Sequence, residues 1–162
     1  MTKILISGAN GQLGSEIRKS SELFPGFSFV FTDLNELDIT SPSAVEAMLK
    51  EEKPQWLINC AAYTAVDKAE TEAETAWLIN SVAPAILAEK SKAVGCRFVH
   101  ISTDYVFDGT NFRPYVEDDE VSPTSVYGST KLEGELISLT NNPETLVIRT
   151  SWLYSSFGGN FV

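Results

Sequence analysis

The fold is decided near the N-terminus by the stretch Ile4-Leu5-Ile6-Ser7-Gly8-Ala9-Asn10-Gly11-Gln12-Leu13-Gly14. Its apolar start predicts a strand, three glycines spaced by three follow, and an amphipathic segment comes next. The order strand, glycine turn, helix is typical of a unit that binds a dinucleotide. A tight strand-to-helix turn without any ligand would use the same glycines, which is the alternative.

Each glycine has a physical purpose in this interpretation. Gly8 would permit the sharp turn off the strand, Gly11 would let the backbone approach a pyrophosphate, and Gly14 would let the helix pack closely on the sheet. The free N–H groups at the helix start would face the anion, and the helix dipole would favour its charge.

Length and composition favour one globular domain over residues 1–162, with 43% apolar residues. Twelve Lys and Arg against 22 Asp and Glu give a formal charge of -10, with no basic stripe, so nucleic acid is not an expected partner. Cys60 and Cys96 lack CxxC spacing and lie in or beside apolar runs, which predicts reduced, buried thiols. No apolar run reaches membrane-spanning length and the first strand begins close to Met1, so we expect a cytoplasmic protein with no membrane partner.

A second predicted strand, residues 27–33, ends in Asp33. An acid about 20 residues after the glycine turn is placed to accept hydrogen bonds from the adenosine ribose. Because a carboxylate repels an additional phosphate and no Arg or Lys follows nearby, we expect NADH to be preferred over NADPH. Asp33 could instead merely cap a turn. Asp38 and Ile39 follow on the same loop and could border the adenine.

The rest of the chain alternates between helical and strand patterns. Predicted helices cover residues 42–53, 71–94 and 126–140, and predicted strands cover 56–60, 97–102 and 145–149. The exit of the third strand, at 61–64, is small enough for a cofactor to lie against. The fold class is therefore α/β, a doubly wound parallel sheet that is Rossmann-like and NAD(P)-binding, with strand order 3-2-1-4-5.

Pro84 lies inside the long helical region and cannot donate a hydrogen bond to the carbonyl of Asn80. We expect a kink there, with a bound water at the free carbonyl as a hypothesis.

His100 and the acidic run at 117–120 can each be interpreted as structural or as functional. His100, in the fourth strand, has no second ligand nearby and is interpreted as a packed or hydrogen-bonded core residue rather than a catalytic one. The acidic run at 117–120 lies in the long loop 106–125 and is interpreted as solvated surface, so no metal site is predicted.

Tyr127 and Lys131 are four residues apart, which on a helix places both on one face. A free phenol titrates near ~10, so a neighbouring ammonium would stabilise the phenolate and make Tyr127 a useful proton donor and acceptor. Lys131 could also hold the nicotinamide ribose. This spacing also occurs by chance on solvated helices, and the glycine turn upstream favours the catalytic interpretation.

Five motifs carry a resemblance to a known family: GANGQLG, NCAAYTAVDKAE, STDYVFDG, YGSTKLEGE and RTSWLYSSFGGNFV. Together they resemble the dTDP-4-dehydrorhamnose reductases, of the extended short-chain dehydrogenase/reductase superfamily. STDYVFDG and RTSWLY are far more restricted than the glycine turn or YxxxK. The resemblance implies hydride transfer from a nicotinamide cofactor to the keto group of dTDP-4-dehydro-L-rhamnose, giving dTDP-L-rhamnose for cell-surface polysaccharide.

The resemblance also implies roles for individual residues. Tyr127 would protonate the new alkoxide, Lys131 would lower the pKa of Tyr127 and bind ribose, and Thr103 would hydrogen-bond the reacting carbonyl. Thr103, Asp104 and Trp152 would contact the substrate. The expected cofactor contacts are Gly8, Asn10, Gly11, Gln12, Leu13, Gly14, Asp33, Asp38, Ile39, Ala62, Tyr63, Thr64, Tyr127 and Lys131.

Family members continue well past Val162, so we expect a truncated dinucleotide-binding domain whose C-terminal part and substrate domain are missing, and whose last strand has an open edge. A homodimer of the full-length protein is a candidate assembly. Two alternatives stay open: a nucleotide-sugar epimerase or dehydratase of the same superfamily, and a non-catalytic regulatory subunit resembling the methionine adenosyltransferase beta subunit.

Overall fold

The computed structural model describes residues 1–158; residues 159–162, which contain Gly159 and the chain end discussed above, lie outside the described part. The strands are β1 (Thr2–Ser7), β2 (Phe27–Thr32), β3 (Trp56–Asn59), β4 (Arg97–Thr103) and β5 (Leu146–Thr150). The α-helices are α1 (Gln12–Ser20), α2 (Pro42–Glu52), α3 (Val66–Ala69), α4 (Ala73–Trp77), α5 (Ala83–Ala93) and α6 (Val126–Asn141). Short 3-10 turns, η1 (Ser21–Leu23) and η3 (Asp104–Val106), and a π-helical segment, η2 (Leu78–Val82), complete the elements.

The five strands form one parallel sheet in the order β2-β1-β3-β4-β5. The α/β class is confirmed, but the predicted order 3-2-1-4-5 is wrong, because β3 pairs with β1 instead of lying outside β2. The side chains of β3 explain this position. Leu57 and Asn59 are both fully buried, which needs a neighbouring strand on each side and helices above.

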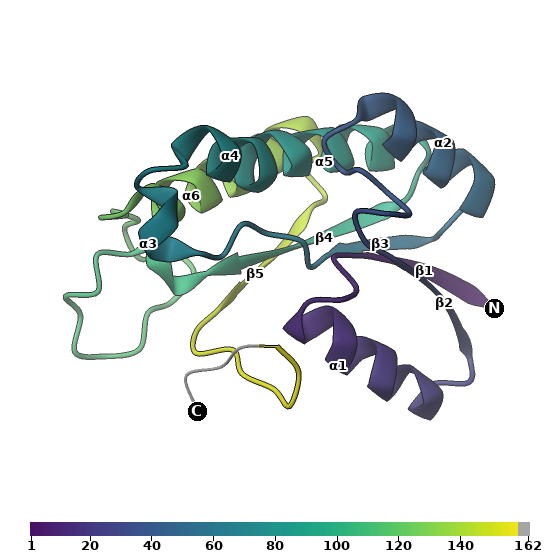
Figure 1. The fold of residues 1–162 in the computed structure, drawn as a ribbon, viewed down its shortest axis with the longest axis horizontal. Helices are drawn as coiled ribbons and strands as arrows, with labels where there is room; N and C mark the ends of the chain where they lie inside the picture. The colour runs from purple at the N-terminus through teal and green to yellow at the C-terminus, as the bar shows by residue number, and fades with distance from the viewer. Residues whose placement is uncertain (159–162) are drawn as a thin grey trace.

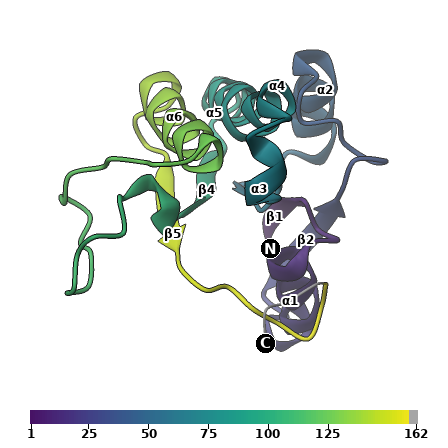
Figure 2. The ribbon, with the colours of Figure 1, turned by 60° about the vertical axis from the view of Figure 1, so that its left-hand side comes forward.

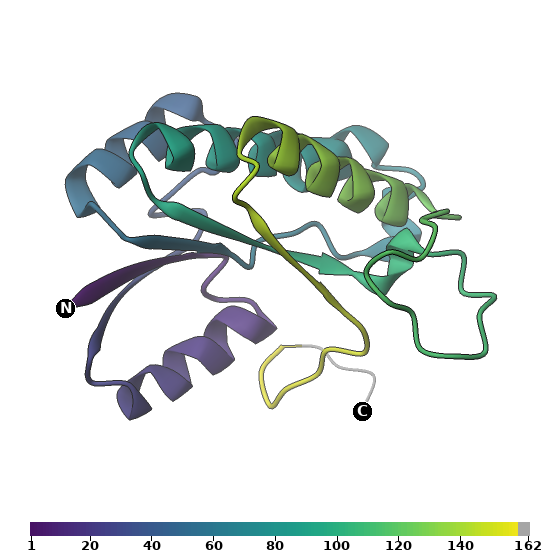
Figure 3. The same ribbon diagram turned by 180° about the vertical axis from the view of Figure 1, so that it is seen from behind.

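Helices cover both faces of the sheet unequally. Figures 1 and 3 show α2, α5 and α6 over one face and α1 under the other. Figure 2 shows α6, α5 and α2 side by side in one layer, and the segment after β5 running beneath the sheet towards α1. The sheet is therefore doubly wound, as predicted.

The main core lies between the sheet and α2 and α5. Burial of apolar surface is the dominant stabilising term in such a layer. The buried residues of this cluster are Leu5, Leu37, Ile39, Val45, Leu49, Leu57, Ala83, Leu87, Ala88, Cys96 and Phe98. Cys60 and Cys96 are free thiols, as predicted, but only Cys96 is fully buried, because Cys60 lies at the strand end and is partly exposed. Desolvation raises their pKa to about 12 for Cys60 and about 11 for Cys96.

The long helical region around Pro84 is continuous but changes its winding. α4 passes into η2, and α5 begins at Ala83, one residue before the proline. A π-helical segment is a recognised way to accommodate a proline within a helix. The expected irregularity is therefore a stretch of wider winding, and the water at the Asn80 carbonyl stays a prediction.

Within residues 1–158, the helices are all too short or too polar to cross a membrane.

Candidate active site

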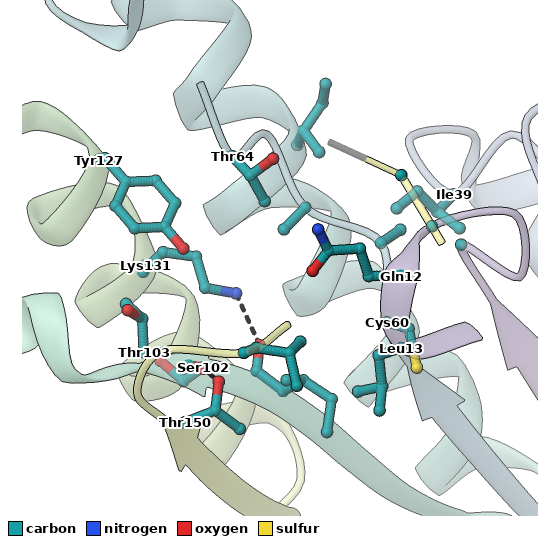
Figure 4. A pocket seen from close by; sticks show the side chains of 18 of the residues that line it. Gln12, Leu13, Ile39, Cys60, Thr64, Ser102, Thr103, Tyr127, Lys131 and Thr150 are labelled. Atoms are coloured by element: carbon teal, nitrogen blue, oxygen red, sulfur yellow. Dashed lines mark hydrogen bonds between the residues drawn. The ribbon is translucent and has the colours of Figure 1, made fainter. Parts of the chain in front are cut away.

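A cavity of about 930 Å³ opens at the carboxyl ends of the strands, a volume suited to a cofactor. It brings together most of the residues singled out in the sequence. Those that line it are Gly8, Asn10, Gly11, Gln12, Leu13, Asp33, Asp38, Ile39, Ala62, Thr64, Thr103, Asp104, Tyr127, Lys131 and Trp152. In Figure 4, Tyr127, Lys131 and Thr103 lie on one side of the cavity, with Gln12 and Leu13 across from them.

The three glycine positions of the first turn differ in whether a side chain would fit. Gly8 has φ of 70°, and a Cβ there would lie 2.5 Å from the backbone nitrogen of Ala61. A Cβ on Gly14 would lie 2.5 Å from the Cα of Ala9, so α1 can pack here only on a glycine. Gly11 lines the cavity, and its added Cβ would meet only the Gly8 carbonyl, at 3.4 Å. Packing within residues 1–158 thus explains Gly8 and Gly14, whereas Gly11 keeps the cavity side of the turn open.

Asp33 both closes a turn and lines the cavity. Its carboxylate accepts hydrogen bonds from the backbone nitrogens of Asn10, at 2.9 Å, and Leu34, at 2.8 Å. Arg18 reaches the same corner from α1: its Nη2 donates to Asn10 Oδ1 at 3.3 Å, and its guanidinium lies 4.7 Å from the Phe31 ring centroid. Arg18 precedes Asp33 in the sequence, and only the fold brings this cation from α1 to the corner at which Asp33 lies.

Tyr127 and Lys131 project from α6 into the side of the cavity opposite the glycine turn. Tyr127 is 8% exposed and packs edge-on against Tyr105 at 5.4 Å between ring centroids. Lys131 is 1% exposed, and its Nζ donates to the Ile101 carbonyl at 2.7 Å. Thr103 Oγ1 donates to Asp104 Oδ1 at 3.2 Å and accepts from the Tyr105 nitrogen at 3.2 Å, beside the Tyr127 ring.

Burial controls the ionisation of both side chains. Desolvation raises the pKa of Tyr127 above its usual value, and the Thr103 hydroxyl only partly offsets this. Desolvation lowers the pKa of Lys131 to about 8, although the charge of Glu135 acts in the opposite direction. The expected lowering of the Tyr127 pKa by Lys131 is therefore absent here, because burial dominates and the Lys131 amine is bound by a carbonyl. A phenol that stays protonated is the form that can donate a proton.

Two glycines let α6 approach the rest of the site. A Cβ on Gly128 would lie 2.3 Å from the Tyr105 carbonyl oxygen, and one on Gly134 would lie 2.0 Å from the Asn80 carbonyl oxygen. The helix begins at a capped end, since Ser125 Oγ accepts from the Gly128 nitrogen at 3.1 Å. The glycines of YGSTKLEGE therefore fix how deeply Tyr127 and Lys131 enter the cavity.

Asn80 connects the segment after β3 to α6 through hydrogen bonds of its side chain. Its side-chain Oδ1 accepts from the Tyr63 nitrogen at 2.9 Å, and its Nδ2 donates to the Tyr63 carbonyl at 3.1 Å and to Thr130 Oγ1 at 3.2 Å. Tyr63 itself does not line the cavity, and its hydroxyl donates to Glu72 at 2.5 Å. Of the expected cofactor contacts, Tyr63 and Gly14 therefore do not line the cavity, although they lie next to residues that do.

Four further residues at the strand ends line the cavity; Ala61 and Ser102 lie at strand exits expected on this edge, whereas Cys60 and Thr150 were not expected from the sequence. Ser102 is 3% exposed, and its hydroxyl has no hydrogen-bond partner among the described residues. Position at a strand end was the available signal, because the carboxyl ends of parallel strands all meet at one edge.

The two expected substrate contacts near β5 lie at the open side of the cavity. Trp152 is 75% exposed and has φ of 53°. Asp104 Oδ2 accepts a hydrogen bond from Ser151 Oγ at 2.6 Å, which joins η3 to the segment after β5. Among residues 1–158, no three His, Cys, Asp or Glu side chains gather to hold a metal ion, and the acidic run at 117–120 lies on the surface.

The comparisons with known proteins identify the family. A family model described as the RmlD substrate binding domain matches residues 1–162. The dTDP-4-dehydrorhamnose reductase of Aggregatibacter actinomycetemcomitans is 41% identical over all of this chain and 55% of its own length. A probable dTDP-4,6-dihydroxy-2-methyloxan-3-one 4-ketoreductase of Streptomyces antibioticus is 47% identical over 98% of this chain and 54% of its own length.

Among solved structures, the dTDP-4-dehydrorhamnose reductase of Bacillus anthracis in complex with NADP has a TM-score of 0.95 and 40% identity, covering 99% of this chain and 57% of its own. The chain thus spans about half the length of the relatives it matches. Since the family model covers the whole sequence and the fold matches that of a solved relative, the chain belongs to the RmlD substrate binding domain family, that of the dTDP-4-dehydrorhamnose reductases.

Proposed function

We propose that residues 1–162 form the dinucleotide-binding part of an NAD(P)H-dependent reductase acting on the 4-keto group of a dTDP-linked 6-deoxy sugar, with dTDP-4-dehydro-L-rhamnose as the substrate. One observation carries the proposal: Tyr127, Lys131 and Thr103 line the same cavity as the turn from Gly8 to Leu13. This arrangement supports the proposal, because a glycine turn that would bind phosphate and a phenol that would donate a proton would then act on one volume.

When bound, the reduced nicotinamide supplies a hydride to the carbonyl carbon. The protein residues would then handle the oxygen. Thr103 would hydrogen-bond it, and Tyr127 would donate the proton that converts the new alkoxide to a hydroxyl. Lys131 would hold the ribose hydroxyls and help Tyr127 to recover its proton.

Three finer statements belong to this proposal. Asp33 would favour NADH over NADPH, because it lines the cavity and a carboxylate near the adenosine ribose would repel an additional phosphate. The complete protein would work in the cytoplasm, where nucleotide-sugars are made, and a homodimer is its candidate assembly. The sugar itself is the least constrained point, since a relative at 47% identity is named for a different dTDP-linked ketone.

The test uses the complete gene product that contains residues 1–162. We expect absorbance of NADH to decay in proportion to the dTDP-4-keto-6-deoxy sugar consumed. An epimerase or a dehydratase would yield product without stoichiometric NADH loss, and a regulatory subunit would bind NADH without turnover.

Changing Tyr127→Phe should abolish reduction while NADH binds within about twofold of the unchanged protein, because the ring stays and only the proton donor is lost. Binding is measured by NADH fluorescence and turnover by absorbance. Full turnover in this variant would show that the proton comes from another group.

A further inference from the structure

A row of buried polar side chains lies under the cavity, and the proposed chemistry gives it no role. Ser7 on β1 pairs in register with Asn59 on β3, which pairs with His100 on β4. The three residues are 1%, 0% and 0% exposed. Groups so deeply buried normally satisfy one another's hydrogen bonds, so the direction of each bond in this row can be worked out.

The orientation of the Asn59 amide is decided by a backbone donor. The Ala61 N–H, which can only donate, lies 3.1 Å from Asn59 Oδ1, and Ser7 Oγ lies 2.8 Å from the same oxygen. A flipped amide would place an NH₂ group against the Ala61 N–H. Asn59 Nδ2 therefore faces His100, at 3.3 Å from its Nδ1.

This amide in turn decides which nitrogen of His100 carries the proton. Asn59 Nδ2 is a donor, so Nδ1 of His100 must accept, and the proton of the neutral ring lies on Nε2. The doubly protonated ring would meet Asn59 with a second donor. Burial and the charge of Lys131 also hold the pKa of His100 well below its usual value.

The Nε2–H of His100 then points at Lys131, whose Nζ is 3.4 Å away. An uncharged amine can accept this hydrogen and still donate to the Ile101 carbonyl at 2.7 Å. An ammonium has no lone pair to accept with. Glu135, one turn along α6, favours the charged form, but its carboxylate is bound by Arg149 at 2.7 Å. Tyr127 is protonated at neutral pH and adds no charge.

We propose that the row Ser7, Asn59 and His100 holds the imidazole as a hydrogen-bond donor towards Lys131 and thereby makes it easier for Lys131 to lose its proton. His100 is a positioning residue, because it acts through Lys131. The consequence for binding rests on the proposed function, in which the ammonium of Lys131 binds the ribose hydroxyls. NADH affinity should therefore weaken above a pH of about 8, at which Lys131 loses its proton.

The first test is direct, because the sequence has a single histidine. In the ¹⁵N-labelled 162-residue chain, long-range ¹H–¹⁵N spectra at pH 7.5 distinguish the two neutral tautomers. We expect the Nε2–H form. The Nδ1–H form or an imidazolium would overturn the proposal, whether or not the chain binds a dinucleotide.

The second test reverses the direction of the hydrogen bond between residue 59 and His100. In Asn59→Asp, a carboxylate accepts from Nδ1–H, so the ring proton should move to Nδ1 and leave Nε2 free to accept from Lys131. We expect the alkaline loss of NADH affinity to move up by about one pH unit or more, as for a group that gains a hydrogen-bond acceptor. Asn59→Leu adds no charge and removes the amide that holds the ring proton of His100 on Nε2. The alkaline loss of NADH affinity should therefore move to higher pH in this variant too.

Lys131→Met is the control for the second test, since the alkaline change should disappear in that background. If Asn59→Leu and Asn59→Asp both leave the pH midpoint unchanged, the proposal is wrong. If the unchanged chain fails to bind NADH at any pH, the proposed function is wrong, and the tautomer measurement still decides the inference. Should either variant fail to fold, that same measurement on the unchanged chain remains decisive.

Discussion

At the scale of single residues, charge around Asp33 is the point at which cofactor choice would be made. Asp33 would disfavour an additional phosphate at the ribose, whereas Arg18, which contacts Asn10 and Phe31, places a cation at the same corner. The balance between a carboxylate and a guanidinium is what distinguishes NAD from NADP sites in related folds. Arg18 would offset part of the NADH preference proposed for Asp33.

Arg18→Gln should therefore weaken NADPH binding by about fivefold, the size expected for an exposed ion pair, and leave NADH binding unchanged. Fluorescence titration of the 162-residue chain measures both. Lys19→Gln is the matched control, because it removes the same charge from α1 at a side chain that lies over Phe157. An equal loss for the two cofactors would assign Arg18 to the stability of the turn instead.

A second residue-scale prediction concerns acid stability. The pKa of His100 is well below its usual value in the folded chain, so the unfolded chain binds more protons and stability is lost as pH falls below about 6.5. The free energy of unfolding should drop by up to about 1.4 kcal/mol per pH unit there. Urea unfolding at pH 7.5, 6.0 and 5.0 measures this. His100→Gln has no histidine to titrate, and an identical slope in that variant would contradict the assignment.

At the scale of elements, α6 is the part that the site depends on most. It carries Tyr127 and Lys131, its two glycines contact η3 and η2, and Glu135 binds Arg149 of β5. Arg149 also lies 5.0 Å from the centroid of the Phe107 ring, which stacks on Tyr115 at 4.1 Å. The loop after η3 is thus joined to β5 and α6 through one guanidinium.

Gly134→Ala should destabilise the fold by about 1–3 kcal/mol, as overpacking does, although alanine is the better helix former. The added Cβ would lie 2.0 Å from the Asn80 carbonyl oxygen, so α6 must move away from η2. Thermal unfolding and NADH binding should both be affected. Gly26→Ala is the control, since a Cβ there has no neighbour within 4 Å. Equal stability of the two variants would mean that the helices separate at little cost.

At the scale of the whole molecule, the sheet has an exposed edge at β5. On β5, an edge strand, Leu146 is 53% exposed and Ile148 is 42% exposed. An exposed apolar edge strand is a template for pairing with another chain. The open edge expected from the sequence is thus present within the described residues.

We therefore expect the 162-residue chain to self-associate at micromolar concentration, and Ile148→Lys to reduce this, since a charge on an edge strand opposes pairing. Sedimentation velocity over a concentration series measures the effect. Glu144→Gln, just before β5, is the control, because it also raises the net charge by one but does so outside the strand. A chain that stays monomeric at every concentration would show that the edge is protected.

Sequence alone predicted the elements well, because each leaves a local pattern. The glycine turn, the alternation of strand and helix, and the Tyr127–Lys131 spacing are all readable within a few residues. The strand order was predicted wrongly for the opposite reason, since the place of β3 depends on burial of Leu57 and Asn59 by distant segments. The role of Arg18 was missed because it reaches Asn10 from another element.

The amino-acid sequence by itself determined the class of fold, the glycine turn after the first strand, and the helix that carries the phenol and the amine, since these follow from covalent geometry and local periodicity. Only the tertiary structure decided the ionisation of these groups. Burial acts on Tyr127 and Lys131 more strongly than they act on each other. The hydrogen bonds of His100 depend on a register between strands more than 40 residues apart, and no local pattern encodes that register.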